Sequence, residues 1–392
     1  MKEKGFVIDH VIVYSEHEVI QDGFLKVRNG KITEFGHSSE RIAVDNEEIY
    51  HFPEKVSLLP GMIDVHIHGV NGADTMDAST EALDVMTKAL PNEGTTSFLA
   101  TTITQDTQGI EQAIEKVGEY INEFQKPGHA ELLGIHLEGP FLNHKRAGAQ
   151  PLHAIQTPDV GVFEVWNKLS RGSIKLVTLA PEMEGGMELV RYLTERGIVA
   201  SIGHSDATYE QVMNAVEYGA SHVTHLYNGM RGLHHREPGV AGAALLDDRL
   251  KTEIIADGHH VRPEMIELAY RQKSDAGMVL ITDAMRAKCL KNGRYDLGGQ
   301  DVNVQDGIAL LDNGTLAGSV LKMKDALANI QKFTGCSLEN AIKMAAENPA
   351  KQLGVFDRKG SIAVGKDADL LLLNTAGDVV KTFCKGHLAY ST

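Results

Sequence analysis

The sequence is poor in cysteine and has no long hydrophobic run. Its three cysteines, Cys289, Cys336 and Cys384, lie far apart and form no CxxC motif. An odd and sparse set of this kind argues against a disulfide framework and predicts a reducing compartment, the cytoplasm. Because the chain lacks a run of about 18 apolar residues, we expect no membrane span. The first residues also lack the apolar core of a secretory signal, so we expect none.

Positive charge is also scarce. The chain carries 38 Lys and Arg residues against 53 Asp and Glu residues, a formal net charge of −15. This balance disfavours non-specific binding to nucleic acid or to an anionic membrane. An anionic substrate would therefore need a local basic or amide-lined pocket. The composition, 42% hydrophobic and 23% charged, is otherwise ordinary for a folded protein of this size.

Short apolar runs recur along the middle of the chain. Each is rich in Val, Ile, Leu or Thr and is bounded by Gly, Pro, Asp or Asn. Nearly continuous apolar runs of this length are typical of parallel strands that are buried on both faces. We expect such strands at 58–68, 95–103, 132–138, 175–180, 198–204, 222–227, 252–257 and 278–283.

Stretches with helical periodicity lie between most of these strands. Within 107–125, for example, Ile110, Ile114 and Val117 recur at three- and four-residue steps and mark one helix face. Strands that alternate with helices in this way predict a (β/α)8 TIM barrel. The least helical connection is 229–250, which begins rich in Gly and His. The expected helices are 79–92, 107–125, 159–170, 185–196, 207–218 and 262–273.

Both ends of the chain read as short β segments outside the barrel. Asn29 and Gly30 between two of them are a strong hairpin turn signal. We expect the two ends to pair as one small β-sandwich domain made of 1–57 and 360–392, with the barrel at 58–359. The expected strands are Gly5–Tyr14, Gly23–Arg28, Lys31–Phe35, Glu48–Phe52, Asp369–Leu373 and Val379–Cys384.

The string DVHIHG, Asp64–Gly69, is the most informative motif. It places His66 and His68 two residues apart at the end of an apolar run. Residues i and i+2 of a strand point to the same face, so the two imidazoles form half of a metal site. A single HxH also arises by chance, and its weight depends on further ligand candidates.

Further candidates stand at the ends of four other expected strands: Glu138, His204, His225 and Asp283. The carboxyl ends of barrel strands share one face, where catalytic groups gather. Taken singly, each residue has an ordinary alternative: a buried core histidine, a helix-terminus partner for Glu138, or an N-cap for Asp283. Taken together, they favour a catalytic site for Zn²⁺ or Fe²⁺.

Two other histidines are left out of this expected site. His136 shares the inward parity of Glu138 but lies one layer deeper in the barrel. His222 has the opposite parity to His225, so we expect it to face a helix. Of the two omissions, His136 is the closer alternative to a ligand.

The motifs LPGMIDVHIHG, HLEGPF, THLYN and the closing GSIAVGKDADLLLLN resemble the metal-dependent amidohydrolase superfamily. Within it the chain is similar to the family of N-acetylglucosamine-6-phosphate deacetylases, and the resemblance extends over essentially the whole chain. It implies hydrolysis of the acetamide of the amino-sugar phosphate, giving glucosamine-6-phosphate and acetate. It also implies a cytoplasmic homodimer that serves amino-sugar metabolism and binds neither nucleic acid nor membrane.

The resemblance assigns the metal ligands. Glu138, His204 and His225 would hold one divalent ion, and His66 and His68 would hold a second ion that shares Glu138. One or two ions per subunit are therefore expected. Zn or Fe fits this ligand set best, with Mn or Co left open.

The resemblance also assigns catalytic roles. Asp283 would take a proton from the attacking water and later return one to the leaving amine. His260, or its neighbour His259, would hydrogen-bond the carbonyl oxygen as it becomes an oxyanion. Gln150 stands where many relatives carry a sugar-contacting His, so we expect a substrate contact from its amide.

Phosphate recognition would come from three further residues. Asn228 and Gly229 match amides that contact the phosphate in the family. Arg236 matches an arginine that reaches the phosphate from the neighbouring subunit, and a guanidinium suits a phosphate dianion. The ordinary alternative for Arg236 is a surface ion pair with Glu237 or Asp206.

Two other functions remain open at this stage. One is an N-acyl-amino-acid amidohydrolase on the same scaffold, which would not depend on phosphate. The other is a non-catalytic scaffold that binds partners through its surface. Such scaffolds usually lose metal ligands, and this chain retains the ligand types that the pattern requires.

Overall fold

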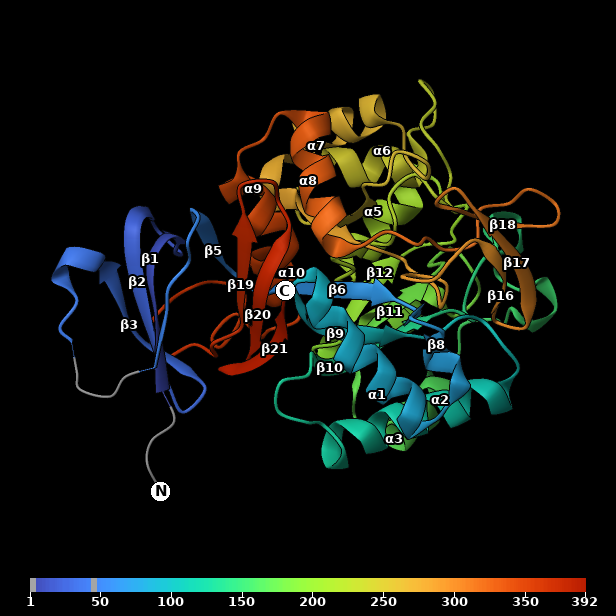
Figure 1. Cartoon of the computed structure of the whole chain (residues 1–392). Coiled ribbons are helices and arrows are strands. Elements are labelled where there is room, and N and C mark those ends of the chain that lie inside the picture. Colours follow the sequence, from blue (N-terminus) through green and yellow to red (C-terminus); the bar gives the residue numbers. More distant parts are fainter. Residues whose placement is uncertain (1–4, 44–47) are drawn as a thin grey trace.

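A parallel β-barrel forms the centre of the computed structural model, which describes residues 5–43 and 48–392 (Figure 1). Its strands pair in the order β15-β14-β13-β12-β11-β10-β9-β6, and every pairing is parallel. They are β6 (Met62–Ile67), β9 (Thr95–Thr101), β10 (Glu131–Glu138), β11 (Ile174–Leu179), β12 (Val199–Ile202), β13 (His222–Val223), β14 (Lys251–Ile255) and β15 (Met278–Ile281).

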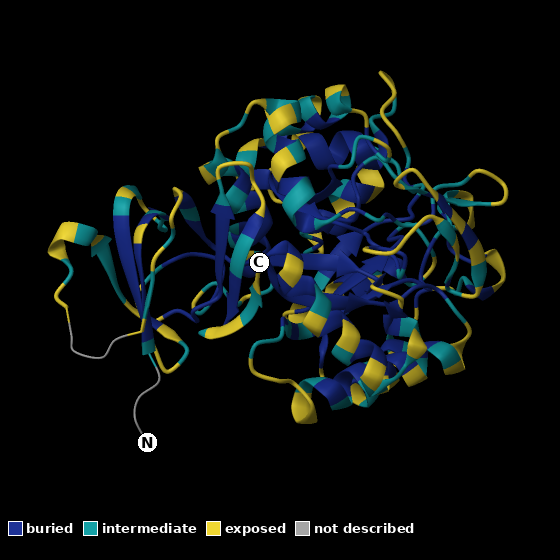
Figure 2. Ribbon diagram, in the orientation of Figure 1, coloured by how far each residue is buried: buried dark blue, intermediate teal, exposed yellow. Residues whose placement is uncertain are grey.

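The last strand meets the first and closes the ring. The Asp283 amide donates to the His66 carbonyl at 2.8 Å, and the His68 amide donates to the Ala284 carbonyl at 2.9 Å. The predicted (β/α)8 barrel is therefore confirmed. Its interior and the inner helix faces are buried, while the outer helix faces and the loops carry exposed positions (Figure 2).

Helices follow the strands and pack around the ring. In α2 the Asp106 side chain caps the first turn through the Gly109 amide, and Ile110, Ile114 and Val117 are buried as the periodicity predicts. The weakly predicted connection contains α6, which is apolar and buried on nearly every side. The helices are α1 (Thr80–Ala89), α2 (Thr107–Glu123), α3 (Val160–Leu169), α4 (Gly186–Glu195), α5 (Tyr209–Glu217), α6 (Gly239–Leu246), α7 (Pro263–Gly277), α8 (Met323–Thr334), α9 (Leu338–Ile342) and α10 (Asn348–Gln352).

The two chain ends build one separate sheet, which confirms the small β domain. Its order is β21-β20-β19-β5-β1-β2-β3, with β4 beside β1, and its strands enclose a core of their own. Residues 1–4 and 44–47 of the predicted domain lie outside the described residues. The strands are β1 (Gly5–Tyr14), β2 (Val19–Arg28), β3 (Lys31–His37), β4 (Glu48–Tyr50), β5 (Val56–Pro60), β19 (Leu370–Asn374), β20 (Val379–Cys384) and β21 (His387–Ser391).

The single strand predicted at 58–68 is wrong. The chain forms β5 in the end sheet and then β6 in the barrel, with Gly61 between them. A Cβ at Gly61 would lie 2.2 Å from Thr96 Oγ1, so only glycine fits this crossing. An uninterrupted apolar run hides the change of sheet from sequence inspection. The domain limits near 57 and 360 stay predictions.

Two small sheets were not expected from the sequence. A hairpin of β7 (Gly69–Val70) and β8 (Ala73–Asp74) follows the first barrel strand. A meander of β16 (Gly293–Leu297), β17 (Gln300–Gln305) and β18 (Ile308–Leu311) follows the last one. Leu297 from the meander lines the cavity at the barrel mouth, so this insertion shapes the site. No helix in the described part of the chain is long and apolar enough to span a membrane.

A partly buried ion cluster joins the end segments to the barrel. Glu131, at the start of β10, lies 2.9 Å from Arg358, 2.7 Å from Lys359 and 2.8 Å from Lys385. Burial raises the pKa of the Glu131 carboxyl, but these three cations outweigh it and lower the pKa to about 2. The ionised carboxylate therefore stabilises the folded chain.

We expect Glu131→Gln to lower the free energy of unfolding at neutral pH by about 3 kcal/mol, since one pKa unit is about 1.4 kcal/mol. A lowered pKa stabilises above the unfolded value and is lost as pH falls toward the folded value. The wild-type advantage in urea unfolding should therefore shrink between about pH 5 and pH 3. Glu123→Gln, which removes an exposed partner of Arg171, is the control and should change little. An advantage that stays constant with pH would contradict this assignment.

Candidate active site and metal centre

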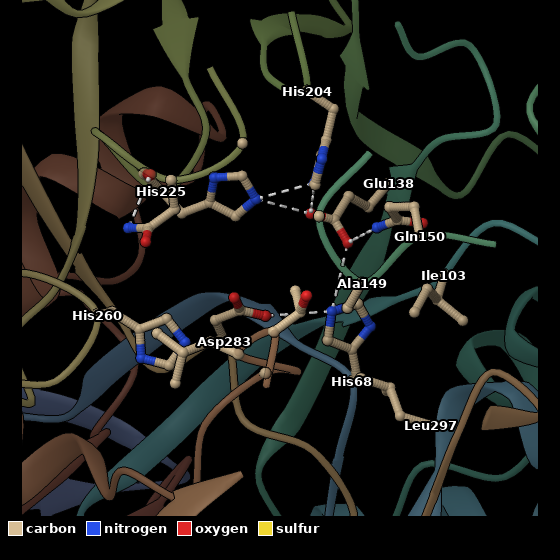
Figure 3. Close-up of a pocket in the computed structure, with 16 residues that line it drawn as sticks. His68, Ile103, Glu138, Ala149, Gln150, His204, His225, His260, Asp283 and Leu297 are labelled. Carbon is tan, nitrogen blue, oxygen red and sulfur yellow. Dashed lines mark hydrogen bonds and ion pairs between the residues drawn. The ribbon is translucent and has the colours of Figure 1, made fainter. Parts of the chain in front are cut away.

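The six predicted ligand and base residues converge at the carboxyl end of the barrel. His66 and His68 stand at the end of β6, and Glu138 is the last residue of β10. The other three follow the ends of β12, β13 and β15: His204, His225 and Asp283. Figure 3 shows His68, Glu138, His204, His225 and Asp283 turned toward one another around a cavity.

Three of these residues have a left-handed backbone conformation, which residues other than glycine rarely adopt. His204, His225 and Asp283 have φ values of 47°, 30° and 48°, in the left-handed region. Each lies just after its strand, where the chain leaves the ladder and turns the side chain over the barrel mouth. For this reason β13 ends at Val223, earlier than the predicted strand. Strain of this kind is concentrated at functional sites.

Glu138, His204 and His225 form the first group of possible ligands. Glu138 Oε1 lies 3.2 Å from His204 Nε2 and 3.1 Å from His225 Nε2, and the two nitrogens are 3.1 Å apart. Ligand atoms around a tetrahedral ion with bonds of about 2.0–2.1 Å lie about 3.3 Å apart. His204 Nδ1 donates to the Arg146 carbonyl, which leaves Nε2 unprotonated for an ion.

His66, His68 and Asp283 form the second group. Asp283 Oδ1 lies 3.4 Å from His66 Nε2 and 3.2 Å from His68 Nε2, and Glu138 Oε2 lies 3.4 Å from His68 Nε2. Within residues 5–43 and 48–392, the buried His66 Nε2 has no hydrogen-bond partner. A buried nitrogen of this kind among carboxylates suits a divalent cation. Glu138 contacts both groups, as a shared ligand requires: Oε1 faces the first group and lies 3.5 Å from His66 Nε2, while Oε2 faces His68.

The charges of the site balance one another. Burial raises the pKa of the Glu138 carboxyl, but His66, His204 and His225 hold it well below its usual value. Burial lowers the pKa of His68, but hydrogen bonds to Asp283 and Glu138 raise it to about 9. The carboxylates of Glu138 and Asp283 therefore stabilise positive charge between them, which protons or a cation can supply. Binding of a metal ion would release these protons.

The cavity brings most of the predicted substrate residues together. Asn228, Gly229, His260 and Gln150 line it beside the ligands, and Arg236 does not. Gly229 has a φ of +56°, and a Cβ there would lie 2.8 Å from His204 Nδ1. Glycine is therefore required where this loop passes the metal ligand.

His260 lines the cavity, whereas its neighbour His259 is exposed. His260 Nδ1 lies 2.6 Å from Asp257, which also accepts the backbone amides of both histidines. Burial lowers the pKa of His260, but the hydrogen bond to Asp257 and nearby negative charge raise it above its usual value. The ring is therefore oriented as a hydrogen-bond donor toward the cavity.

Gln150 is already engaged by protein groups. Its Nε2 donates to Glu138 Oε2 at 2.8 Å, and its Oε1 accepts from the Thr104 amide at 2.9 Å (Figure 3). The amide thus orients the shared carboxylate. The predicted contact to substrate stays a prediction.

Arg236 lies on an exposed loop that projects from the barrel. Its guanidinium contacts the ring of His235 at 2.7 Å. The alternative ion pairs are not formed, because Glu237 accepts the amides of Tyr209 and Gly239, and Asp206 pairs with other arginines. The side chain is therefore available at the surface.

Of the deeper histidines, His136 lies one layer down, between the Val65 carbonyl and Thr178 Oγ1. With His66 and Glu253 it also forms a group that could hold a metal ion, so its omission from the site stays a prediction. His222 does not face a helix: its Nε2 lies 3.1 Å from the buried carboxylate of Glu253. Glu253 was not predicted. Its signal is a charged residue directly before the apolar pair Ile254 and Ile255 of β14.

Comparison with known proteins places these observations in a family. The model of the amidohydrolase family matches residues 57–389. The chain belongs to this family. An N-acetylglucosamine-6-phosphate deacetylase from Bacillus subtilis (strain 168) is 49% identical over 389 residues, which cover 99% of this chain and 98% of the relative.

Solved amidohydrolase structures share the fold along nearly the whole chain. The N-acetylglucosamine-6-phosphate deacetylase of Thermotoga maritima matches with a TM-score of 0.88 at 36% identity, covering 99% of this chain and 100% of the other. The enzyme from Mycobacterium smegmatis, an aspartate-to-alanine variant in complex with N-acetyl-D-glucosamine-6-phosphate, matches with a TM-score of 0.92 at 28% identity and the same coverage.

The two ligand groups predict separable metal content. After removal of metal and reconstitution with Zn²⁺, we expect two ions per wild-type chain by elemental analysis. His204→Asn should lose the ion of the first group, and His68→Asn should lose that of the second, because an amide replaces a ligating imidazole. The exposed His259→Asn is the matched control and should keep wild-type content. Wild-type content in both site variants would contradict the assignment.

Proposed function

We propose that this protein hydrolyses the acetamide of N-acetylglucosamine-6-phosphate to glucosamine-6-phosphate and acetate, in amino-sugar metabolism. The observation that carries the proposal is the position of Asp283. Its carboxylate contacts His68 of the second ligand group and lines the same cavity as Asn228, Gly229 and His260. The deacetylase names of the full-length relatives support this substrate. Complete ligand groups argue against a non-catalytic scaffold.

The chain supplies the ligands and the proton carrier for this reaction. A divalent ion held by these ligands would polarise the acetamide carbonyl and lower the pKa of the attacking water. Burial raises the pKa of Asp283, but His66 and His68 lower it below its usual value. The ionised carboxylate can therefore take the proton of the water and then deliver it to the leaving amine.

His260 would stabilise charge on the carbonyl oxygen. The Asp257 contact to its Nδ1 leaves Nε2 to donate toward the cavity. A donor that is already oriented costs little reorganisation when the oxygen becomes negative. The raised pKa of His260, which is set by Asp257, keeps that donor proton in place near neutral pH.

The phosphate would bind beside Asn228 and Gly229, which line the same cavity as the ligands. The Asn228 side chain already donates to the His225 and Leu226 carbonyls, which fixes this loop in place. We infer that Arg236 of a second subunit completes this subsite in a homodimer, since its guanidinium is exposed and not paired with a carboxylate among the described residues. Its charge would offset locally the net charge of −15.

We also infer that the bound ion is Zn²⁺ or Fe²⁺ and that the protein acts in the cytoplasm. The ligand set of imidazoles and carboxylates suits Zn²⁺ or Fe²⁺ before Mn²⁺ or Co²⁺. The sparse cysteines, of which Cys289 is exposed and Cys384 buried, support a reducing cytoplasm.

The substrate assignment is tested by acetate release from N-acetylglucosamine-6-phosphate beside unphosphorylated N-acetylglucosamine. With Zn²⁺ loaded, we expect the phosphate ester to react at least about 100-fold faster in kcat/KM, because buried anion contacts are worth a few kcal/mol. Equal rates would contradict the phosphate subsite and favour an N-acyl-amino-acid substrate. No release from either sugar would contradict the proposed activity.

Subunit mixing tests Asp283 and Arg236 together. We expect Asp283→Asn to reduce kcat by about 10²–10⁴-fold while keeping the ion of the first group, and Arg236→Ala to raise KM. A mixed dimer of the two variants contains one site with a normal Asp283 and the partner's normal arginine. Activity should therefore recover at low substrate concentration when the variants are co-expressed. If Arg236 acts within its own subunit, mixing restores nothing. Mixing Asp283→Asn with itself is the control.

A further inference from the structure

A buried carboxylate lies directly beneath the metal ligands. Glu253 on β14 is fully buried, and its two oxygens have different partners. Oε2 accepts from His66 Nδ1 at 2.9 Å and from the His225 backbone amide at 3.0 Å. Oε1 lies 3.1 Å from His222 Nε2. One side chain thus contacts a residue from each of the two ligand groups.

The contact to His66 crosses the barrel interior. β14 is separated from β6 by β15 in the strand order, so Glu253 reaches past its neighbouring strand to meet His66. The contact to the His225 amide takes the place of a strand-pairing hydrogen bond, because β13 ends at Val223. The Leu226 amide donates to the Glu253 backbone carbonyl at 2.9 Å and fixes the same segment.

The contact also determines which nitrogen of His66 is protonated. A carboxylate can only accept, so a neutral His66 ring, the form that can bind an ion, carries its proton on Nδ1 and its lone pair on Nε2. Nε2 is the atom that faces Glu138 and Asp283, at 3.5 Å and 3.4 Å. In the part of the chain that the structure describes, it makes no hydrogen bond. A ring with the opposite tautomer could not ligate an ion from this position.

Burial of the Glu253 carboxylate costs free energy, so its presence in the strand needs a physical reason. The other buried positions of β14 are Thr252, Ile254 and Ile255, which pack without charge, whereas Lys251 at the start of the strand is only partly buried. Burying a carboxylate is unfavourable unless every oxygen is paired, and an apolar residue is often the more stable choice. Contacts of this kind behind ligating histidines orient the ring and raise its basicity.

We propose that Glu253 is a positioning residue that sets the tautomer of His66 and holds the His225 segment, so that the two ion sites form together. This inference rests on the proposed metal-dependent function. It adds a residue that does not line the cavity and that acts only through the ligands.

The test compares Glu253→Ala, Glu253→Gln and Glu93→Ala by Zn²⁺ content and by chelator competition. Glu93 is the matched control, because it is also buried and paired, with Lys288, but contacts no ligand. We expect Glu253→Ala to bind the second ion about 10- to 100-fold more weakly. Glu253→Gln keeps an acceptor for His66 and should show a smaller loss. Glu93→Ala should lose thermal stability while keeping wild-type affinity for both ions.

Each outcome decides one point. Wild-type affinity for both ions in Glu253→Ala would overturn the inference and leave the proposed function intact. If Glu253→Ala does not fold, Glu253→Leu, which removes both acceptor oxygens and keeps most of the volume, takes its place, and wild-type affinity for both ions in that variant would overturn the inference. If Glu93→Ala loses as much Zn²⁺ affinity as Glu253→Ala, Glu253 acts on the ion sites only through the stability of the fold, and the inference is overturned. A wild-type protein that binds no ion at these ligands would contradict the proposed function itself, independently of Glu253.

Discussion

The structure of the site depends on one buried carboxylate that several imidazoles share. Glu138 faces His204 and His225 with one oxygen and His68 with the other. A carboxylate removed from water is unstable without such partners, and imidazoles crowded together are unstable without negative charge between them. Each therefore makes the burial of the other possible. The same arrangement aims ring nitrogens at two neighbouring points, which is the geometry needed to bind a pair of divalent ions.

The barrel brings these groups together because parallel strands end at one face. The ligands come from segments that are far apart in sequence, and three of them need a left-handed backbone just beyond a strand. Closure of the ring supports this placement directly, since the amide of Asp283 bonds to the carbonyl of His66. The proton carrier and a metal ligand are thus fixed to each other through the backbone. Below them, Glu253 and His222 form a second polar layer that continues the same charge balance.

Much of this arrangement was predictable from the sequence because it depends on local pattern. Apolar runs and helical periodicity identified the alternating elements, and residue types at run ends identified the ligand candidates. What failed required tertiary information. The crossing at Gly61 interrupts no apolar pattern, and the interior contact of His222 depends on where β13 ends. Glu253 gave only the signal of a charge beside the apolar pair Ile254 and Ile255. Gln150 was expected at the substrate, while its hydrogen bonds to Glu138 and Thr104 depend on a loop whose course the sequence does not specify.

Anomalous X-ray diffraction at the zinc absorption edge, from crystals grown with Zn²⁺, tests the shared-carboxylate account most directly. The account predicts two anomalous peaks that flank the Glu138 carboxylate. One should contact His204 and His225, and the other should contact His66 and His68. Zinc-loaded crystals with no peak inside the barrel mouth, or with peaks that do not touch Glu138, would contradict it.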